Sequence, residues 1–325
     1  MPPSVAKPPR FTLISDLDGT LVDPCDPTHA ALRRFNALWQ KYCAADCRLI
    51  YSTGRSHKKF LELRVRRSHA LAADARRLAS VLLTSHASQR TTPLLAPEIL
   101  ICSVGTEIYR RGEQGGVADE KWSDVLEQGW QRDALLSAAC CARGLTLQEP
   151  SEQRRHKISL RSRVPGGCAG ADAAVEDLRA RLDATGAPYD LIASSGCLDV
   201  DVLPRGANKG AALHFILQEQ AEQALSASGV KVLSKAEALR ACAECTLVAG
   251  DSGNDTQLLA TEHVRAVVVA NAQPELLAWA RDAGPSPRVF VATQRCADGV
   301  IEAMKHFGFV LQDACADAED GDAAA

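Results

Sequence analysis

The chain has 325 residues, and its 37 Lys and Arg residues nearly balance 40 Asp and Glu residues, leaving a formal net charge of −3. This length exceeds what one hydrophobic core normally supports, so we expect two domains. With 46% hydrophobic and 24% charged residues, the composition excludes a disordered or fibrous protein. The charge balance argues against a nucleic-acid partner, and no apolar run approaches the ~18 residues that would imply a membrane-spanning helix.

Twelve cysteines are scattered along the chain, and residues 1–10 contain two Pro-Pro pairs but no apolar run of the kind found in secretory signals. Cysteines in such a sequence are typically reduced thiols in a reducing compartment. We therefore expect a cytoplasmic protein.

The first third of the sequence alternates between strand and helix patterns. Short apolar runs predict strands at 11–15, 48–51 and 98–102. Apolar residues at helical spacing follow Asp26, and an Arg- and Ala-rich stretch predicts a helix over 57–82. Strands that alternate with helices predict a doubly wound, Rossmann-like α/β domain with a parallel sheet covered on both faces.

The pattern changes after the glycine cluster at 112–116. The next helices are predicted at 119–143, with an interruption at Gly129, and at 171–185, and the next strands at 156–163, 191–193 and 198–203. We interpret this part as a smaller α+β domain inserted into the larger one. The doubly wound pattern then resumes, with a helix from Asn208, strands at 246–249, 266–270 and 288–291, and a helix at 297–306.

These patterns divide the chain into four segments: the larger domain's first part (1–118), the inserted domain (119–204), the larger domain's second part (205–315) and a disordered acidic tail (316–325). Two stretches, 64–92 and 219–243, are longer than the alternating pattern requires, and we interpret both as added surface helices. Neither stretch contains a residue of the motifs described next.

Two carboxylates follow the first predicted strand. Asp16 and Asp18 lie two residues apart, and since side chains alternate along a strand, both should face one spot at its carboxyl end. Ligands of open α/β sheets bind at this edge. Carboxylates so close together favour a bound cation or one protonated member. One Asp could then attack phosphorus while the other transfers a proton, although an ordinary acidic turn would produce the same short motif.

Further polar motifs follow other strands. The Gly-rich loop 250–255 places Asp251 and Asp255 after an apolar strand, and such carboxylates suit Mg²⁺ if they reach the same edge as Asp16. Thr53 and Gly54 close the second strand with a hydroxyl and an unobstructed N–H. Lys209 begins a helix, whose N-terminus already favours an anion, so these three residues are candidate phosphate ligands.

This order of motifs resembles the haloacid-dehalogenase-like (HAD) phosphatases and covers the larger domain. Connecting segments throughout 11–309 resemble, more narrowly, the sucrose-6-phosphate phosphatase family. The segments that carry this closer resemblance are 103–108, 156–159, 251–255, 271–277 and 292–308.

The resemblance implies a role for each motif residue. Asp16 would be the nucleophile that forms an aspartyl-phosphate, and Asp18 would be the general acid and base. The implied Mg²⁺ site consists of Asp16, Asp251, Asp255 and the backbone carbonyl of Asp18, with Asp255 orienting metal-bound water or pairing with Lys209. The implied substrate ligands are Thr53, Gly54, Lys209 and Asn254 at the phosphate, and His156, Lys157, Ser159 and Ser195 in the inserted domain, which would act as a sugar-binding cap.

The resemblance further implies hydrolysis of sucrose 6-phosphate to sucrose and phosphate, the last step of sucrose biosynthesis. Two alternatives remain open. One is a phosphatase of the same cap type that acts on another glycosyl phosphate, such as mannosyl-3-phosphoglycerate, which would need an extra cationic clamp. The other is a non-enzymatic module that binds sucrose-phosphate synthase, a protein that could also be a partner of the enzyme.

Overall fold

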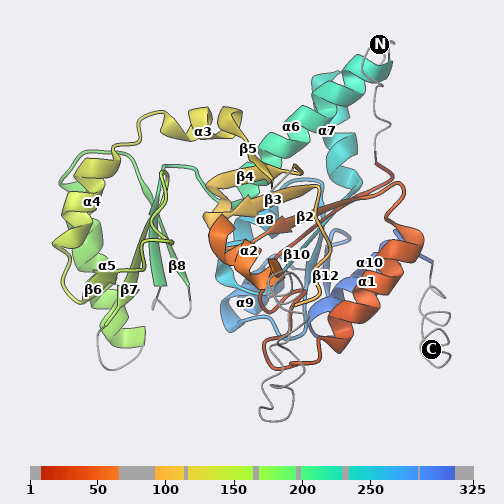
Figure 1. Cartoon of the computed structure of the whole chain (residues 1–325), viewed down its shortest axis with the longest axis horizontal. Helices are drawn as coiled ribbons and strands as arrows, with labels where there is room; N and C mark the ends of the chain where they lie inside the picture. The colour runs from red at the N-terminus through yellow and green to blue at the C-terminus, as the bar shows by residue number, and fades with distance from the viewer. Residues whose placement is uncertain are drawn as a thin grey trace, which may run out of the picture.

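The computed structural model describes residues 9–65, 92–112, 116–163, 168–194, 199–228, 234–284 and 286–311. These residues form an eight-stranded sheet flanked by helices and a separate four-stranded sheet beside it (Figure 1). The predicted α/β class is therefore confirmed. Within the described part of the chain, no helix combines the length and the apolar character that crossing a membrane requires.

The larger sheet has the strand order β12-β11-β10-β1-β2-β3-β4-β5. Its strands are β1 (Thr12–Ser15), β2 (Arg48–Ser52), β3 (Ile99–Cys102), β4 (Glu107–Arg110), β5 (Val117–Ala118), β10 (Thr246–Gly250), β11 (Arg265–Val268) and β12 (Val289–Val291). From β12 to β3 all neighbours are parallel, whereas β4 and β5 add an antiparallel hairpin at one edge. The sequence pattern did not predict this hairpin, because charged residues, Glu107 and Arg110, stand at both ends of β4 and because β5 has only two residues.

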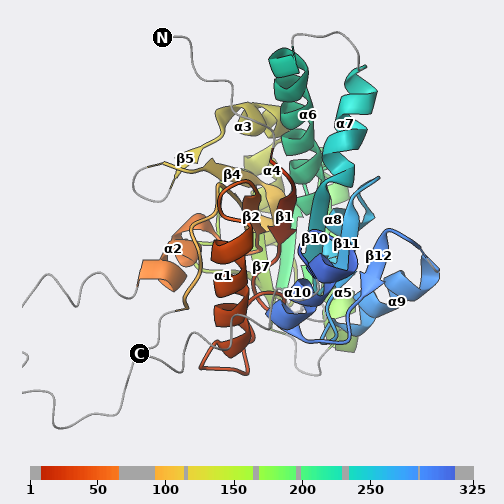
Figure 2. The ribbon, with the colours of Figure 1, turned by 90° about the vertical axis from the view of Figure 1, so that its right-hand side faces the viewer.

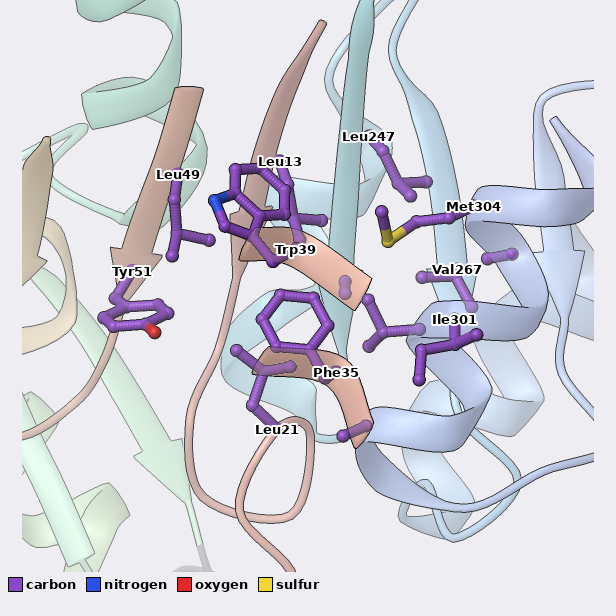
Figure 3. Close-up of a cluster of buried hydrophobic side chains, with 14 of the residues drawn as sticks. Leu13, Leu21, Phe35, Trp39, Leu49, Tyr51, Leu247, Val267, Ile301 and Met304 are labelled. Atoms are coloured by element: carbon purple, nitrogen blue, oxygen red, sulfur yellow. The ribbon is translucent and has the colours of Figure 1, made fainter. Parts of the chain in front are cut away.

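Alternate strand residues divide the interior of this domain into two hydrophobic clusters. Leu13 of β1 packs with Phe35 and Trp39 on one face, whereas the next residue, Ile14, packs with Leu213 on the other. Figure 3 shows the first of these clusters. The helices around the sheet are α1 (Ala30–Tyr42), α2 (His57–Val65), α6 (Lys209–Ser228), α7 (Lys235–Glu244), α8 (Thr256–Ala260), α9 (Pro274–Asp282) and α10 (Cys296–His306).

Helices α6 and α7 lie side by side (Figure 2), so part of the stretch 219–243 forms a helical pair. Most of the other long stretch, 64–92, lies outside the described residues, as does the tail 316–325.

The smaller sheet is antiparallel, with the order β6-β7-β9-β8. Its strands are β6 (Leu145–Leu147), β7 (Ile158–Ser162), β8 (Asp190–Ser194) and β9 (Asp199–Leu203), and helices α4 (Arg132–Cys140) and α5 (Cys168–Asp183) accompany them. Val200 and Val202 of β9 belong to a third hydrophobic cluster. The residues that alternate with them, Asp199 and Asp201, therefore face the opposite side of this sheet.

Helix α3 (Glu120–Glu127) packs on the larger domain although it lies within the predicted inserted segment. Its Trp122 belongs to the same cluster as Leu213 and donates a hydrogen bond from Nε1 to the carbonyl of Gly105 at 3.0 Å. The chain then turns at Gly129, which has a φ of 77° that favours glycine. We propose that the hinge between the two domains lies near this glycine; the limits 119–204 stay a prediction.

Candidate active site

Three carboxylates meet at the carboxyl end of the larger sheet. Asp16 follows β1 and Asp251 follows β10, and these two strands are parallel neighbours. The N–H of Asp16 continues their ladder by donating to the carbonyl of Ala249 at 3.0 Å. Each of Asp16, Asp251 and Asp255 is buried, and their ligand oxygens all lie within 4.8 Å of one another. The sheet thus gathers charges that are 239 residues apart in the sequence (255 minus 16).

Lys209 lies within this acidic cluster. Its side chain is fully buried, and its Nζ donates to Asp16 Oδ1 and to Asp255 Oδ1, each at 2.7 Å. A close approach of the backbone brings it there. Gly105, which has a φ of 98°, lies so near the start of α6 that a Cβ on it would be 2.3 Å from the carbonyl carbon of Asn208. Only glycine permits this contact, so the loop after β3 sets the position of Lys209.

Asp251 and Asp255 are held by their own loop and by the turn after β1. Asp255 Oδ2 accepts from the N–H groups of Asp251 and Ser252, each at 3.2 Å. The Thr20 hydroxyl donates to Asp251 Oδ1 at 3.1 Å. A Cβ on Gly19 would lie 2.4 Å from Asp251 Oδ2, so the turn can come this close only with glycine. Both oxygens of Asp255 are therefore engaged, whereas Asp251 Oδ2 has no hydrogen bond to any described residue.

Burial and mutual repulsion shift the titration of this cluster. Burial raises the pKa of Asp16 well above its usual range; Lys209 opposes this rise, and the neighbouring carboxylates add to it. Burial and then the charge of Asp255 raise the pKa of Asp251 to about 7. Burial lowers the pKa of Lys209, but the carboxylates of Asp16 and Asp255 outweigh this effect, so the pKa is raised overall. The cluster therefore holds more negative charge than one lysine neutralises, and a cation would relieve it.

Asp18 lies apart from the buried cluster. Its carboxylate is half-exposed and accepts two hydrogen bonds from Arg55, from Nε and from a terminal nitrogen, each at 2.6 Å. The N–H of Arg55 donates to Thr53 Oγ1 at 3.1 Å, so the buried Thr53 side chain supports the turn. Gly54, between them, borders the cavity described next. Sequence reasoning missed Arg55, although a basic residue directly after the Thr-Gly pair was the available signal.

A cavity of about 410 Å³ joins the acidic cluster to the smaller sheet. The larger domain contributes several predicted site residues to its wall: Asp16, Asp18, Gly54, Asp251 and Asn254. The smaller sheet and the loop before β7 contribute the opposite wall, which includes Gln148, Glu152, Lys157, Ser159, Arg161, Asp199 and Asp201. One wall of this cavity therefore carries buried carboxylates from the larger domain, and the opposite wall carries polar residues from the smaller sheet.

The polar wall is a network of paired charges. Lys157 is almost fully buried, and its Nζ lies 3.3 Å from Glu152 Oε2 and 3.6 Å from Asp201 Oδ1. The Ser159 hydroxyl donates to Asp201 Oδ1 at 2.5 Å. Burial raises the pKa of Asp201, with Lys157 opposing the shift. Every group in this network therefore already has a polar partner.

Glu152 connects the two domains. Its Oε1 accepts from the Ser56 hydroxyl at 3.0 Å and lies 3.1 Å from Lys59 Nζ, and both of these residues belong to the larger domain. Its Oε2 faces Lys157. Sequence reasoning missed Glu152, Lys59 and Asp201, because only the folded chain shows which charged residues face the cavity.

Of the predicted cap contacts, His156 lies away from the cavity, and the prediction for Ser195 is not tested. His156 is buried, and its Nε2 lies 2.7 Å from Glu127 Oε2 at the end of α3 rather than in the cavity wall. His156 lies in the turn just before β7 (Ile158–Ser162), where it faces α3, whereas the next residue, Lys157, borders the cavity. Ser195 lies outside the described residues.

Comparisons with known proteins point to one family. A family model described as sucrose-6F-phosphate phosphohydrolase matches residues 9–71 and 67–308. Probable sucrose-phosphatase 2 of Arabidopsis thaliana is 35% identical over 93% of this chain, which spans 61% of that protein's length. A mannosylfructose-phosphate phosphatase of Agrobacterium fabrum is 28% identical over 93% of this chain, and the match covers 98% of that protein's length.

A solved structure supports the same relationship. The X-ray structure of the sucrose-phosphatase from Synechocystis sp. PCC6803, in complex with sucrose and phosphate, is 32% identical to this chain. The two structures superpose with a TM-score of 0.66, and the superposition covers 92% of this chain and 98% of the Synechocystis chain. The fold is therefore that of the HAD phosphatases with a cap domain.

Proposed function

The chain belongs to the sucrose-6F-phosphate phosphohydrolase family, and from this membership we propose that it hydrolyses sucrose 6-phosphate to sucrose and phosphate. The observation that carries the proposal is the cavity in which the buried carboxylate cluster with Lys209 faces the paired polar wall of the smaller sheet. The carboxylate cluster with Lys209 can bind and attack a phosphate group, and the polar wall can bind a hydroxyl-rich sugar.

Asp16 is the proposed nucleophile. One of its oxygens would attack phosphorus to form an aspartyl-phosphate, while the bond from phosphorus to the sugar oxygen breaks. Asp18, exposed at the cavity and held by Arg55, would donate a proton to the departing sugar oxygen. It would then take a proton from the water that hydrolyses the aspartyl-phosphate, which restores both carboxyl groups.

We propose Mg²⁺ as the resident cation. Asp16 and Asp251 each keep an oxygen with no hydrogen bond to any described residue, and hard oxygen ligands of this kind suit Mg²⁺. These two side chains and the Asp18 backbone carbonyl would hold the ion, whereas Asp255 would hold Lys209. When bound, Mg²⁺ would neutralise negative charge beside the phosphate.

The phosphate would lie between Lys209 and the turn after β2. Lys209 supplies a full positive charge at the N-terminus of α6, and Gly54 leaves the backbone open to the cavity. Thr53 supports that turn, and Asn254 borders the same cavity. This placement puts the phosphorus next to Asp16.

The sugar would contact the opposite wall. Carboxylates there can accept hydrogen bonds from hydroxyls, and Lys157 can donate to a sugar oxygen. The four cations that line the cavity, two from each domain, all have carboxylate partners: Arg55 with Asp18, Lys59 and Lys157 with Glu152, and Arg161 with Asp199. No described cation there is free to clamp a second anionic group, which favours a neutral disaccharide over mannosyl-3-phosphoglycerate.

Experiments can distinguish two alternatives, another disaccharide phosphate as the substrate and a non-enzymatic role, from the proposed function. Mannosylfructose phosphate is also a neutral disaccharide esterified with phosphate, so the charge argument does not exclude it. A non-enzymatic module binding sucrose-phosphate synthase would need neither Lys209 nor the three buried carboxylates, and their presence together favours an enzyme. Binding of this synthase by the enzyme is a further proposal, which co-purification of the two proteins would test.

Phosphate release from a panel of substrates tests the proposal. The panel contains sucrose 6-phosphate, mannosylfructose phosphate, mannosyl-3-phosphoglycerate and glucose 6-phosphate, each with and without Mg²⁺. We expect the highest kcat/KM for sucrose 6-phosphate, and activity only with the metal. A higher value for another member would reassign the substrate, and no release from any member would overturn the proposal of an enzyme.

A further inference from the structure

A second polar cavity lies at the amino ends of the strands, away from the catalytic cavity. It has a volume of about 270 Å³ and shares no lining residue with the catalytic one. Arg48, the first residue of β2, borders it, whereas the far end of the same strand leads to Thr53. At about 3.3 Å per residue, the two ends of β2 are about 13 Å apart. The proposed phosphatase chemistry does not use this cavity.

Most charges around this second cavity are already paired. Arg110 donates to Asp119 and to Glu219. Arg111 donates to Glu98 Oε1 at 3.1 Å, and the other oxygen of Glu98 accepts from the N–H of Leu49 at 2.7 Å. The two carboxylates of the wall, Glu98 and Glu219, therefore each have a cationic partner.

Arg48 is the exception. Its side chain is half-buried, and its guanidinium makes no hydrogen bond or ion pair with any residue that the structure describes. Burial lowers its pKa although the nearby charges of Glu98 and Glu219 oppose the shift, so the cost of removing this guanidinium from water outweighs these two carboxylates. Guanidinium groups in such surroundings normally bind a carboxylate or a phosphate through two parallel hydrogen bonds.

Gln220 of α6 supplies a second unused donor in the same wall. The residue is 9% exposed, and its Nε2 is buried without an acceptor among the described residues. The last torsion of a glutamine side chain is broad and roughly two-fold, so this amide can rotate to donate to a ligand in the cavity that Gln220 lines. Two donors with no acceptor, one of them charged, require a ligand with at least two acceptor oxygens.

We propose that this second cavity is a binding site for a small oxyanion, either a carboxylate or inorganic phosphate, held by Arg48 and Gln220. Its volume lies just below the ~300 Å³ at which pockets for drug-sized ligands begin, so the ligand is a small ion. Ile99 and Ile216 add apolar surface to the wall, and an ion pair is stronger beside apolar surface than in bulk water.

Isothermal titration calorimetry of the full chain in Tris-chloride tests the proposal with two probes, sodium malonate and sodium phosphate. Malonate should bind at one site. Arg48→Met, which keeps the aliphatic stem, should weaken its binding about tenfold or more. Phosphate should show a second site besides the catalytic one, and this second site should be lost in Arg48→Met. Binding of phosphate alone at the Arg48 site would identify phosphate as the ligand and would still support the proposal.

Arg265→Met is the matched control, because Arg265 begins β11 at the same end of the sheet but does not border the cavity. Both variants should keep their basal phosphate-release activity. Gln220→Glu provides a second test: its carboxylate would occupy the position of the oxyanion, so its Tm should rise in anion-free buffer and respond no further to malonate. Malonate and phosphate binding that is equal in Arg48→Met and the parent would overturn the proposal. A Gln220→Glu variant that still responds to malonate would do the same.

Discussion

The two walls of the catalytic cavity are built on opposite electrostatic principles. In the wall from the larger sheet, three buried carboxylates share one lysine, and burial raises the pKa of Asp16 and of Asp251. In the wall from the smaller sheet, charges such as Lys157 and Asp201 are paired with one another. The wall from the larger sheet has charges without partners, so it favours binding of ions, namely a cation and a phosphate. The wall from the smaller sheet has paired charges and instead favours neutral polar groups. Each prediction below changes one wall, or the contact between the two domains, and measures the effect on activity or stability.

Removing the nucleophile should have the largest effect. Asp16→Asn keeps the shape of the side chain but cannot attack phosphorus, so we expect turnover of every substrate to fall by roughly a thousandfold or more. Steady-state phosphate release measures this, and thermal unfolding shows whether the fold is intact. Asp46→Asn, at an exposed ion pair with Arg10, is the control and should leave activity unchanged. Activity of Asp16→Asn within tenfold of the parent would show that Asp16 is not the nucleophile.

Removing the cation should abolish activity reversibly. Without it, the carboxylates of Asp16 and Asp251 would repel the phosphate dianion and prevent productive binding. EDTA should therefore stop phosphate release from sucrose 6-phosphate and from p-nitrophenyl phosphate alike, and added Mg²⁺ should restore both. Full activity after exhaustive chelation would contradict the proposed role of the cluster.

The wall from the larger sheet should also make the stability of the protein depend on pH. The pKa of Asp251 in the folded chain is about 7, above its usual value of 3.8, so the folded state binds this proton more tightly than the unfolded state. The resulting contribution is fully present below about pH 4 and is lost as the pH rises through 7. Asp16 has a shift of the same sign.

We therefore expect the Tm of the metal-free protein to fall between pH 5 and pH 8, and the rise in Tm produced by Mg²⁺ to grow over the same range. Differential scanning calorimetry with and without Mg²⁺ measures both quantities. Asp251→Asn, which cannot ionise, should have a flatter profile and a smaller response to the metal. A Mg²⁺ response that is the same at both pH values in the parent would disprove this account of the cluster.

The contact between the two domains should have the smallest effect. Ser56→Ala removes one hydrogen bond to Glu152, while Lys59 continues to hold the same oxygen. We expect the KM for sucrose 6-phosphate to rise about two- to tenfold. The rate with p-nitrophenyl phosphate should not change. Ser137→Ala, whose hydroxyl bonds only within α4, is the matched control, and an equal effect in both variants would remove Ser56 from the account.

The sequence predicted the first wall better than the second for a physical reason. Asp16, Asp251 and Lys209 lie in short motifs with glycine, and parallel strands bring their carboxyl ends to one edge whatever the intervening sequence. The second wall depends on strand register and on the orientation of a whole domain. Those features turn Lys157 inward and His156 outward, and they bring Glu152 to Ser56.

The fold shows the same division. Short apolar runs correctly predicted the parallel strands of the larger sheet, and the sequence also predicted helices α1, α6 and α10, but not α8 and α9. Strands β4, β5 and β6 were missed, because β4 contains the charged residues Glu107 and Arg110, β5 has only two residues, and Thr146 interrupts β6. Hydrogen bonds to a neighbouring strand stabilise them: β4 pairs with β3, β5 with β4, and β6 with β7.

The most direct test of the division between the two walls is Lys157→Met assayed with two substrates. The substitution keeps the buried stem but removes the charge that faces Glu152 and Asp201. We expect kcat/KM for sucrose 6-phosphate to fall roughly ten- to a hundredfold, while hydrolysis of p-nitrophenyl phosphate, which has no disaccharide, stays nearly unchanged. Lys235→Met, at an exposed ion pair on α7, should change neither value. An equal fall with both substrates, or no fall with either, would contradict the assignment of sugar recognition to the smaller sheet.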